Sequence, residues 1–175
     1  TGKLFAYEHY DVVPDIVSSA KALGAGFPIG AMLTTDKVAP SFALGTHGST
    51  FGGNPLAAAV GNAAFDIIHQ TETLAHVRAQ GECLQAELRK IGETHGVFAE
   101  VRGLGLLIGA VLSDAYHGKA GEFVKVALTQ GLMILNAGTN VVRFAPSLLL
   151  SDADLQAAVV KLNATAAQFV TEQGV

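Results

Sequence analysis

Lys21 has surroundings that can make an amine chemically reactive. It is the only charged residue between Asp15 and Asp36, in a run of small and apolar residues that extends from Ile16 to Gly30. An amine removed from water loses its proton more readily, and the neutral form is the nucleophile that condenses with carbonyl groups. The same run also suits a lysine at a strand end, with its stem on apolar surface and its charge in water. This window alone leaves both interpretations open.

A glycine-rich turn from Gly45 to Pro55 carries hydroxyl groups and leads into an alanine-rich stretch. Asn54 is predicted to cap a helix in which Pro55 takes the first position. Such a turn before a helix offers free backbone N–H groups to an anion such as phosphate. It lacks the Gly-Lys-Ser/Thr ending of a P-loop, which argues against a nucleotide enzyme of that type. An ordinary connection to a capped helix explains the same residues.

Arg143 is the third residue that indicates a binding role. It lies in an apolar segment from Val141 to Phe144, and Pro146 fixes the exit of that segment. A guanidinium group stays charged and its fork matches a carboxylate. That carboxylate belongs either to a ligand or to a buried acidic residue of the protein, and the sequence does not decide between them.

The composition indicates a folded chain and excludes several classes of function. Half of the 175 residues are hydrophobic and 15% are charged, which is typical of a protein with a core. The formal net charge of −4 and the scattered basic residues argue against a nucleic-acid partner. Cys83 is the only cysteine and lies in a predicted helix, and the histidines lack ligand spacing, so we expect no metal site. No apolar run reaches membrane-spanning length.

Hydrophobic periodicity predicts two parts of different character. In the first, a buried strand over 15–19 and a strand over 29–33 precede a helix over 54–70 and a second helix from Thr73 to near Gly96. In the second, we expect strands at 97–101 and 104–112 joined by a turn at Arg102-Gly103, a helix at 122–130, strands at 132–135 and 141–144, and a final helix opened by Ser151. The order ββαββα is typical of a small α+β domain whose antiparallel sheet is covered on one face.

Several segments, taken together and in order, resemble the C-terminal part of the class III (ornithine-type) aminotransferases, and within them the acetylornithine/succinylornithine aminotransferases. The matching segments are 1–10, 14–24, 26–30, 45–55 and 142–146. The resemblance implies an α/β fold, the fold-type I architecture of pyridoxal 5′-phosphate (PLP)-dependent transferases, present in part. Residues 1–95 would form the end of the large PLP-binding domain with a linking helix, and residues 96–175 the small C-terminal α+β domain.

The resemblance also implies roles for four residues. Lys21 would be the catalytic residue, binding the aldehyde of PLP covalently and then moving protons at the substrate carbon. Thr50 would bind the cofactor phosphate of the neighbouring subunit, which implies a homodimer with shared active sites. Ser49 would lie beside the substrate, and Arg143 would hold a substrate carboxylate. Family members act in the cytoplasm, which is the expected location.

Family members are more than twice as long as this chain, and the acidic residue that pairs with the pyridine nitrogen lies before the point that matches Thr1. We therefore expect a fragment that is inactive alone. The complete enzyme would move the terminal amino group of N-acetylornithine or N-succinylornithine to 2-oxoglutarate. Two alternatives remain: another class III aminotransferase, of the ornithine or 4-aminobutyrate type, and a non-catalytic module that keeps the fold for binding or dimer contacts.

Overall fold

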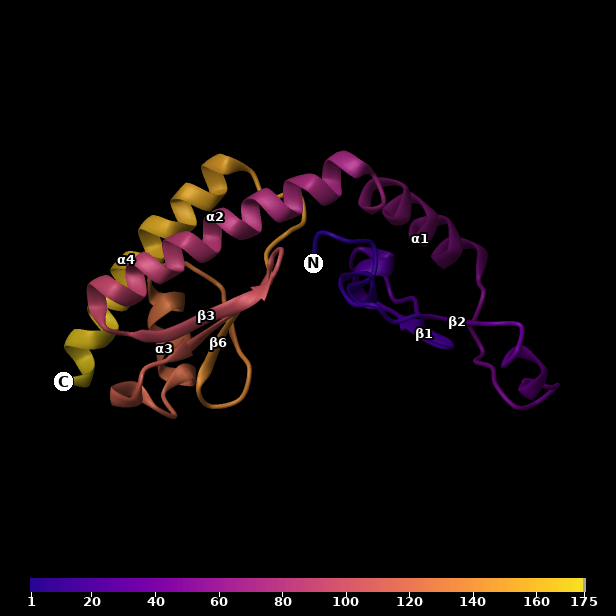
Figure 1. The fold of residues 1–175 in the computed structure, drawn as a ribbon, viewed down its shortest axis with the longest axis horizontal. Helices are drawn as coiled ribbons and strands as arrows, with labels where there is room; N and C mark the ends of the chain where they lie inside the picture. Colours follow the sequence, from indigo (N-terminus) through magenta and orange to yellow (C-terminus); the bar gives the residue numbers. More distant parts are fainter. Residues whose placement is uncertain (175) are drawn as a thin grey trace. The chain divides into compact units, whose positions relative to one another are not determined.

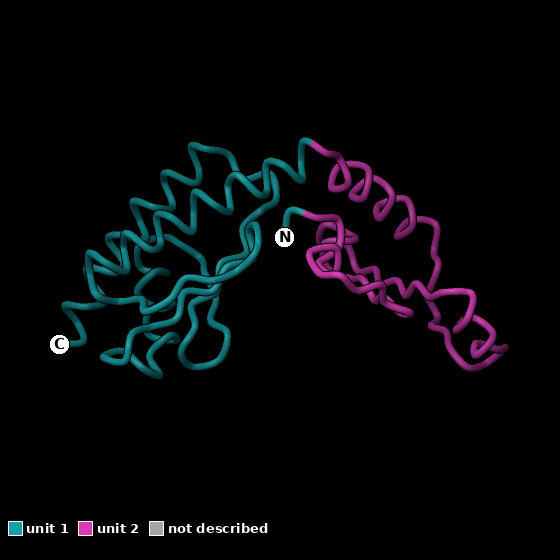
Figure 2. Tube along the Cα trace, in the orientation of Figure 1, with its two compact units in different colours: residues 1–2, 72–175 teal, residues 3–71 magenta. Residues whose placement is uncertain are grey.

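The computed structural model describes residues 1–174, which form two compact units (Figure 2). The N-terminal unit is Lys3–Thr71, and the C-terminal unit is Thr1–Gly2 with the chain from Glu72 onward. The sequence placed a boundary at 95/96, with the helix before it assigned to the first part. In the structure, residues 72–95 of that helix pack in the same compact unit as the residues that follow it. The assignment of residues 1–95 and 96–175 to the family's large and small domains stays a prediction.

The C-terminal unit is a four-stranded antiparallel sheet with helices on one face (Figure 1). Its strand order is β3-β4-β6-β5. The elements are α2 (Thr71–His95), β3 (Phe98–Leu104), β4 (Leu107–Leu112), α3 (Ala120–Thr129), β5 (Leu135–Asn136), β6 (Val141–Phe144) and α4 (Asp152–Gln173). This arrangement confirms the predicted ββαββα order and the antiparallel pairing.

Burial alternates along the strands of this sheet, so its two faces differ. On β4, Ile108, Ala110 and Leu112 are buried, and they pack in one core with residues such as Phe123 of α3 and Phe169 of α4. The residues between them on β4 are more exposed. We call the helix-covered side the inner face and the other side the open face.

Three predicted boundaries in this unit are wrong. The strand expected over 132–135 shares only Leu135 with β5. Helix α2 begins at Thr71, so Thr73 lies in its first turn and does not cap it. The turn between β3 and β4 falls at Gly105-Leu106, and Arg102 and Gly103 are inside β3. Gly105 has φ +52 and lies against α2, where a Cβ on Gly81 would overlap the Gly105 carbonyl oxygen. This close approach depends on two glycines 24 residues apart, which no local pattern reveals.

The N-terminal unit has short elements and few buried residues. Its elements are η1 (Ala6–His9), β1 (Ile16–Ser19), η2 (Lys21–Gly24), β2 (Ala31–Thr34), η3 (Ala39–Ser41) and α1 (Pro55–Ile68). Strands β1 and β2 form a two-stranded antiparallel ribbon in register Ile16 to Thr34. The bounds of both strands lie within two residues of the predicted ones, 15–19 and 29–33. The expected burial of the first strand is wrong, because Ile16 is 51% exposed and no described layer covers the ribbon.

Three further features bear on function. Cys83 lies on α2, exposed and free. Within residues 1–174, no three His, Cys, Asp or Glu side chains gather as a metal site. None of the helices in the described part of the chain has the length and apolar character needed to cross a membrane.

Candidate functional site

Lys21 stands at the end of strand β1, as the first residue of the 3-10 turn η2. The preceding Ala20 is extended, whereas Lys21 has φ +51, in the left-handed region that favours glycine. A non-glycine residue in this region costs about 1–2 kcal/mol. Such strain persists where surrounding structure enforces it and is concentrated at functional sites. The backbone therefore presents this lysine in a specific, costly conformation.

The side chain of Lys21 is exposed, and it makes no hydrogen bond or ion pair with any residue in the described part of the chain. Of the two interpretations of Lys21, the amine removed from water is therefore wrong for this chain. The described β1–β2 sheet has two strands, and α1 contacts the turn that begins at Lys21. The position of the lysine at a strand end is as predicted.

Helix α1 holds the turn that follows Lys21. Gly61 of α1 faces this turn, because a Cβ on it would lie 3.6 Å from the Leu23 carbonyl oxygen and 3.3 Å from Ile29 Cδ1. A glycine at this position lets the helix approach the turn closely. The α1–η2 contact thus fixes the backbone just after Lys21.

Asn54 organises the glycine-rich turn before α1. Its Oδ1 accepts a hydrogen bond from the Ala57 backbone N–H at 2.8 Å, which confirms the predicted N-cap. Its Nδ2 donates to the Phe51 carbonyl oxygen at 2.8 Å. The Gly52 N–H donates to the Ser49 carbonyl oxygen at 3.2 Å and closes the turn. One side chain therefore caps the helix and ties the turn to it.

A cavity of about 580 Å³ opens at this helix N-terminus. It is lined by residues 27–30 on one side and by Ser49, Phe51–Asn54, Ala57 and Ala58 on the other. Pro55 carries no N–H and Asn54 takes the Ala57 N–H, so it is the dipole at the start of this 14-residue helix that favours an anion here. The hydroxyl of Ser49 is a further donor suited to a phosphate group.

In the described part of the chain, the three predicted residues of this unit, Lys21, Ser49 and Thr50, do not gather around one cavity. Ser49 lines the cavity, whereas Lys21 and Thr50 do not. Thr50 is exposed. The segment 27–30 was not predicted as part of a site, although 26–30 was one of the segments that match the family, and Ile29 and Gly30 were placed in the strand expected over 29–33.

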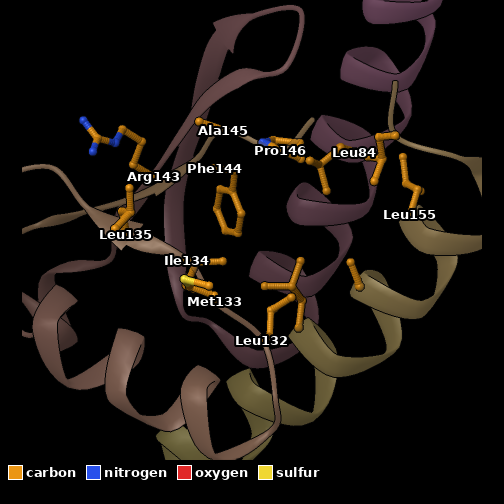
Figure 3. A pocket seen from close by; sticks show the side chains of 13 residues that line it. Leu84, Leu132, Met133, Ile134, Leu135, Arg143, Phe144, Ala145, Pro146 and Leu155 are labelled. Carbon is orange, nitrogen blue, oxygen red and sulfur yellow. The ribbon is translucent and has the colours of Figure 1, made fainter. Parts of the chain in front are cut away.

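Arg143 lies on the open face of the C-terminal sheet. Its neighbours Val142 and Phe144 are buried on the inner face, whereas Arg143 is exposed. In Figure 3 its guanidinium group points away from the apolar cavity that Phe144 enters. No ion pair involving Arg143 is found within residues 1–174. The alternative of a buried pair with an acidic residue is therefore wrong here, and the guanidinium is free to take a ligand carboxylate.

The family model and the related sequences that match this chain all indicate aminotransferases. The sequence profile of the family Aminotransferase class-III matches residues 1–165. The acetylornithine aminotransferase of Neisseria meningitidis serogroup B is 59% identical over 169 residues, which cover 97% of this chain and 42% of that protein. The succinylornithine transaminase/acetylornithine aminotransferase of Pseudomonas aeruginosa is 52% identical, with the same coverage. The chain thus spans about two fifths of the length of the curated relatives it matches.

Solved structures agree. The N-acetylornithine aminotransferase of Stenotrophomonas maltophilia superposes with a TM-score of 0.90 and 46% identity, over 98% of this chain and 44% of that one. An ornithine aminotransferase of Toxoplasma gondii, described with partial occupancy of PLP at its active site, has a TM-score of 0.89 and 30% identity, over 100% of this chain and 42% of that one. These neighbours confirm a partial fold-type I architecture of PLP-dependent enzymes. The chain belongs to the class-III aminotransferases.

Proposed function

We propose that the protein containing this chain is a PLP-dependent transaminase that moves the terminal amino group of N-acetylornithine or N-succinylornithine to 2-oxoglutarate. The observation that carries the proposal is the strained Lys21 at a strand end, held by α1 in the same unit as a cavity suited to phosphate. Relatives named for acylornithine substrates are 52–59% identical. The structures named ornithine aminotransferase are 28–31% identical, so the ornithine type is the weaker candidate.

Each predicted site residue has a chemical task in this proposal. The Lys21 amine would hold the cofactor and would then take and return the proton at the substrate carbon that carries the amino group. The cofactor, when bound, supplies an electron sink for that carbon. Ser49 orients the substrate, and Thr50 binds the phosphate group. Arg143 binds a substrate carboxylate through its planar fork.

We propose further that the working enzyme is a homodimer in which Thr50 serves the site of the neighbouring subunit. Lys21 and Thr50 line no common cavity in the described part of the chain, and both side chains are exposed. Two residues that bind the same small cofactor must meet in the active enzyme. A second copy is the simplest way to bring the Thr50 of one chain to the Lys21 of another.

The test uses the complete product of the gene that encodes this chain. With PLP present, we expect amino transfer from N-acetylornithine or N-succinylornithine to 2-oxoglutarate, and little transfer from free ornithine or 4-aminobutyrate. Lys21→Ala should abolish both the transfer and the visible absorption band of the bound cofactor. Preference for ornithine or 4-aminobutyrate would contradict the proposed substrate, and full activity of Lys21→Ala would contradict the role of Lys21.

One observation favours a second candidate for the 175-residue chain alone. With Lys21 exposed, the chain alone lacks the enclosure that a PLP enzyme needs, and it fits a non-catalytic binding or dimerisation module. Adding PLP to the isolated chain separates the two. A visible absorption band that is lost in Lys21→Ala supports the enzyme fragment, whereas no spectral change together with dimer formation supports the module.

A further inference from the structure

The side chain of Ile29 lies between two glycines of the N-terminal unit. A Cβ built on Gly24, the buried residue of the turn η2, would lie 2.7 Å from Ile29 Cγ2. A Cβ built on Gly61 of α1 would lie 3.3 Å from Ile29 Cδ1. The isoleucine therefore fills the space that a side chain at either glycine would take. Through it, the turn that begins at Lys21 packs against helix α1.

The pairing of β1 with β2 brings Ile29 to the same place. Ser19 pairs with Ala31; Lys21 is two residues past Ser19, and Ile29 is two residues ahead of Ala31. A Cβ on Gly30 would lie 3.6 Å from the Ser19 carbonyl oxygen, so the two chains are still close beyond the last pair. Ile29 thus lies beside the end of β1, where the lysine turn begins.

The lysine turn needs support because its backbone is strained at both ends. Lys21 has φ +51 and Ala25 has φ +48, both in the left-handed region. Backbone hydrogen bonds donated by the N–H groups of Leu23 and Ala25, each 3.1 Å long, close the turn. Strain of this kind is kept only where the surrounding structure enforces it. The packing of Ile29 supplies such a constraint from outside the turn.

Ile29 also lines the cavity at the start of α1, which Ser49 and Asn54 line as well. The same residue therefore borders the lysine turn, the helix and the cavity suited to phosphate. Close-packed groups of this kind shift only together. A change at Ile29 should accordingly be felt at Lys21, although the two side chains do different work.

We propose that Ile29 is a positioning residue for Lys21. By packing on Gly24 and Gly61 it holds the lysine turn in its left-handed conformation and so sets where the amine stands. It acts through Lys21 and not on the reacting atoms. The kinetic consequence of this inference rests on the proposed function, whereas its structural consequence does not.

The structural consequence is tested on the complete gene product without PLP, by hydrogen–deuterium exchange. Ile29→Ala should speed exchange of the Leu23 and Ala25 amides by about 10-fold or more, because less free energy is then needed to open the turn. Ile67→Ala is the matched control, since it makes the same change at a half-exposed position of α1. It should leave exchange at the turn unchanged.

The kinetic consequence is tested with PLP bound. Ile29→Ala should lower kcat about 10- to 100-fold, the loss expected when a catalytic group is misplaced. It should also shift the pH midpoint of the visible absorption of the bound cofactor, which reports the surroundings of the Lys21 amine. A residue that only stabilised the fold would move neither quantity in the folded enzyme.

A conservative variant and a rescue sharpen the test. Ile29→Val keeps the Cγ2 that faces Gly24 and loses only the Cδ1 that faces Gly61, so its kcat should fall by less than about 10-fold. Gly61→Ala, added to Ile29→Val, places a methyl group beside the space that Cδ1 has left. The double variant should recover part of the lost kcat, and no recovery would contradict the packing on α1.

Three results would overturn the inference: unchanged exchange at the turn in Ile29→Ala, an equal change in Ile67→Ala, or faster exchange with kcat and pH midpoint unchanged. If Ile29→Ala does not fold, Ile29→Val decides by the same measurements. Failure of the proposed function has a different signature, an absence of amino transfer in the wild-type protein. Exchange of the protein without PLP, which needs no turnover, then decides on Ile29 by itself.

Discussion

Lys21 occupies a backbone conformation that glycine adopts at lower cost. Its φ of +51 follows directly on an extended Ala20, and the next residues are held against α1. If only the stability of this turn mattered, glycine would be the favoured residue. A lysine in this strained conformation therefore indicates that its amine has a chemical role.

This strain can be measured by comparing two variants that both lack the amine. We expect Lys21→Gly to be more stable than Lys21→Ala by about 1 kcal/mol, because glycine relieves the left-handed strain but adds chain entropy to the unfolded state. Urea unfolding of the complete gene product without cofactor gives both free energies. Equal stability of the two variants would mean that the backbone at Lys21 is not strained.

Arg143 allows the opposite test, in which binding changes and stability does not. It is exposed and has no ion pair in residues 1–174, so its loss should change the free energy of unfolding by less than about 0.5 kcal/mol. Arg143→Met should nevertheless raise KM for amino donor and acceptor alike by about 10- to 100-fold. Steady-state kinetics and urea unfolding of the same preparation check both parts. A large loss of stability would indicate a structural role instead.

At the scale of elements, the crossing of α2 over the β3–β4 turn depends on Gly81. A Cβ on this residue would overlap the Gly105 carbonyl oxygen, and the backbone on both sides is packed. Gly81→Ala should therefore destabilise the protein by roughly 1–3 kcal/mol, despite the better helix propensity of alanine. Thermal unfolding of the complete gene product measures the loss.

Gly121 in α3 is the control for Gly81. Nothing lies within 4 Å of a Cβ built on it, so Gly121→Ala should be neutral or stabilising by up to about 1 kcal/mol. If both alanine variants behaved alike, the close approach at Gly81 would not be what sets its cost.

The Asn54 cap connects helix α1 to the anion-binding turn, and one substitution separates its two hydrogen bonds. Asn54→Asp keeps the acceptor for the Ala57 N–H and loses the donor to the Phe51 carbonyl. We expect little change in helix stability but weaker PLP binding, since the added negative charge repels a phosphate at the cavity.

Asn54→Ala, in contrast, should lower the free energy of unfolding by about 1 kcal/mol, because the helix cap is lost. Spectroscopic PLP titration and thermal unfolding distinguish the two variants, and unchanged PLP affinity in Asn54→Asp would argue against phosphate binding at this turn.

The sequence predicted those features that depend on neighbouring residues. Asn54 was predicted as a cap because a cap acts within three residues, and Ser151 was predicted as the start of the last helix; the structure confirms both. The Arg102-Gly103 pair was misread as a turn, because glycine suits a turn as well as a tight strand. The place of both residues inside β3 follows from the pairing of β3 with β4, which lies outside the reach of a local pattern.

The exposure of Lys21 and Arg143 was not predictable for a related reason. Burial depends on which layers cover a residue, and an apolar neighbourhood in sequence does not say which layers are present. The expected fold class needed no such information, because the resemblance of several short segments in fixed order was enough. The structural neighbours confirm it.

At the scale of the whole molecule, the two units differ in how much core they contain. In residues 3–71 the only residues classed as buried are Gly24, Ala57, Gly61 and Ala64, whereas the C-terminal unit has a continuous core. Large apolar side chains in the N-terminal unit are exposed; examples are Val13, Leu44 and Phe51. Such a unit has little hydrophobic stabilisation of its own.

We therefore expect the isolated 175-residue chain to be cleaved first within residues 3–71 by a dilute protease. Fragments that begin near Glu72 should persist, because their backbone belongs to the packed unit. Mass spectrometry of timed digests identifies the cut sites. Equal survival of both units, or a single cooperative thermal transition for the chain, would contradict the expectation.

Because the N-terminal unit has few buried residues, its stability should depend on what it binds. A molecule that binds only the folded form adds its binding free energy to stability. The lysine and the anion-binding turn both lie in the unit with the least packing, so PLP bound there would stabilise that unit of the isolated chain. Protection of residues 3–71 from the protease by added PLP would then report on occupancy of the turn.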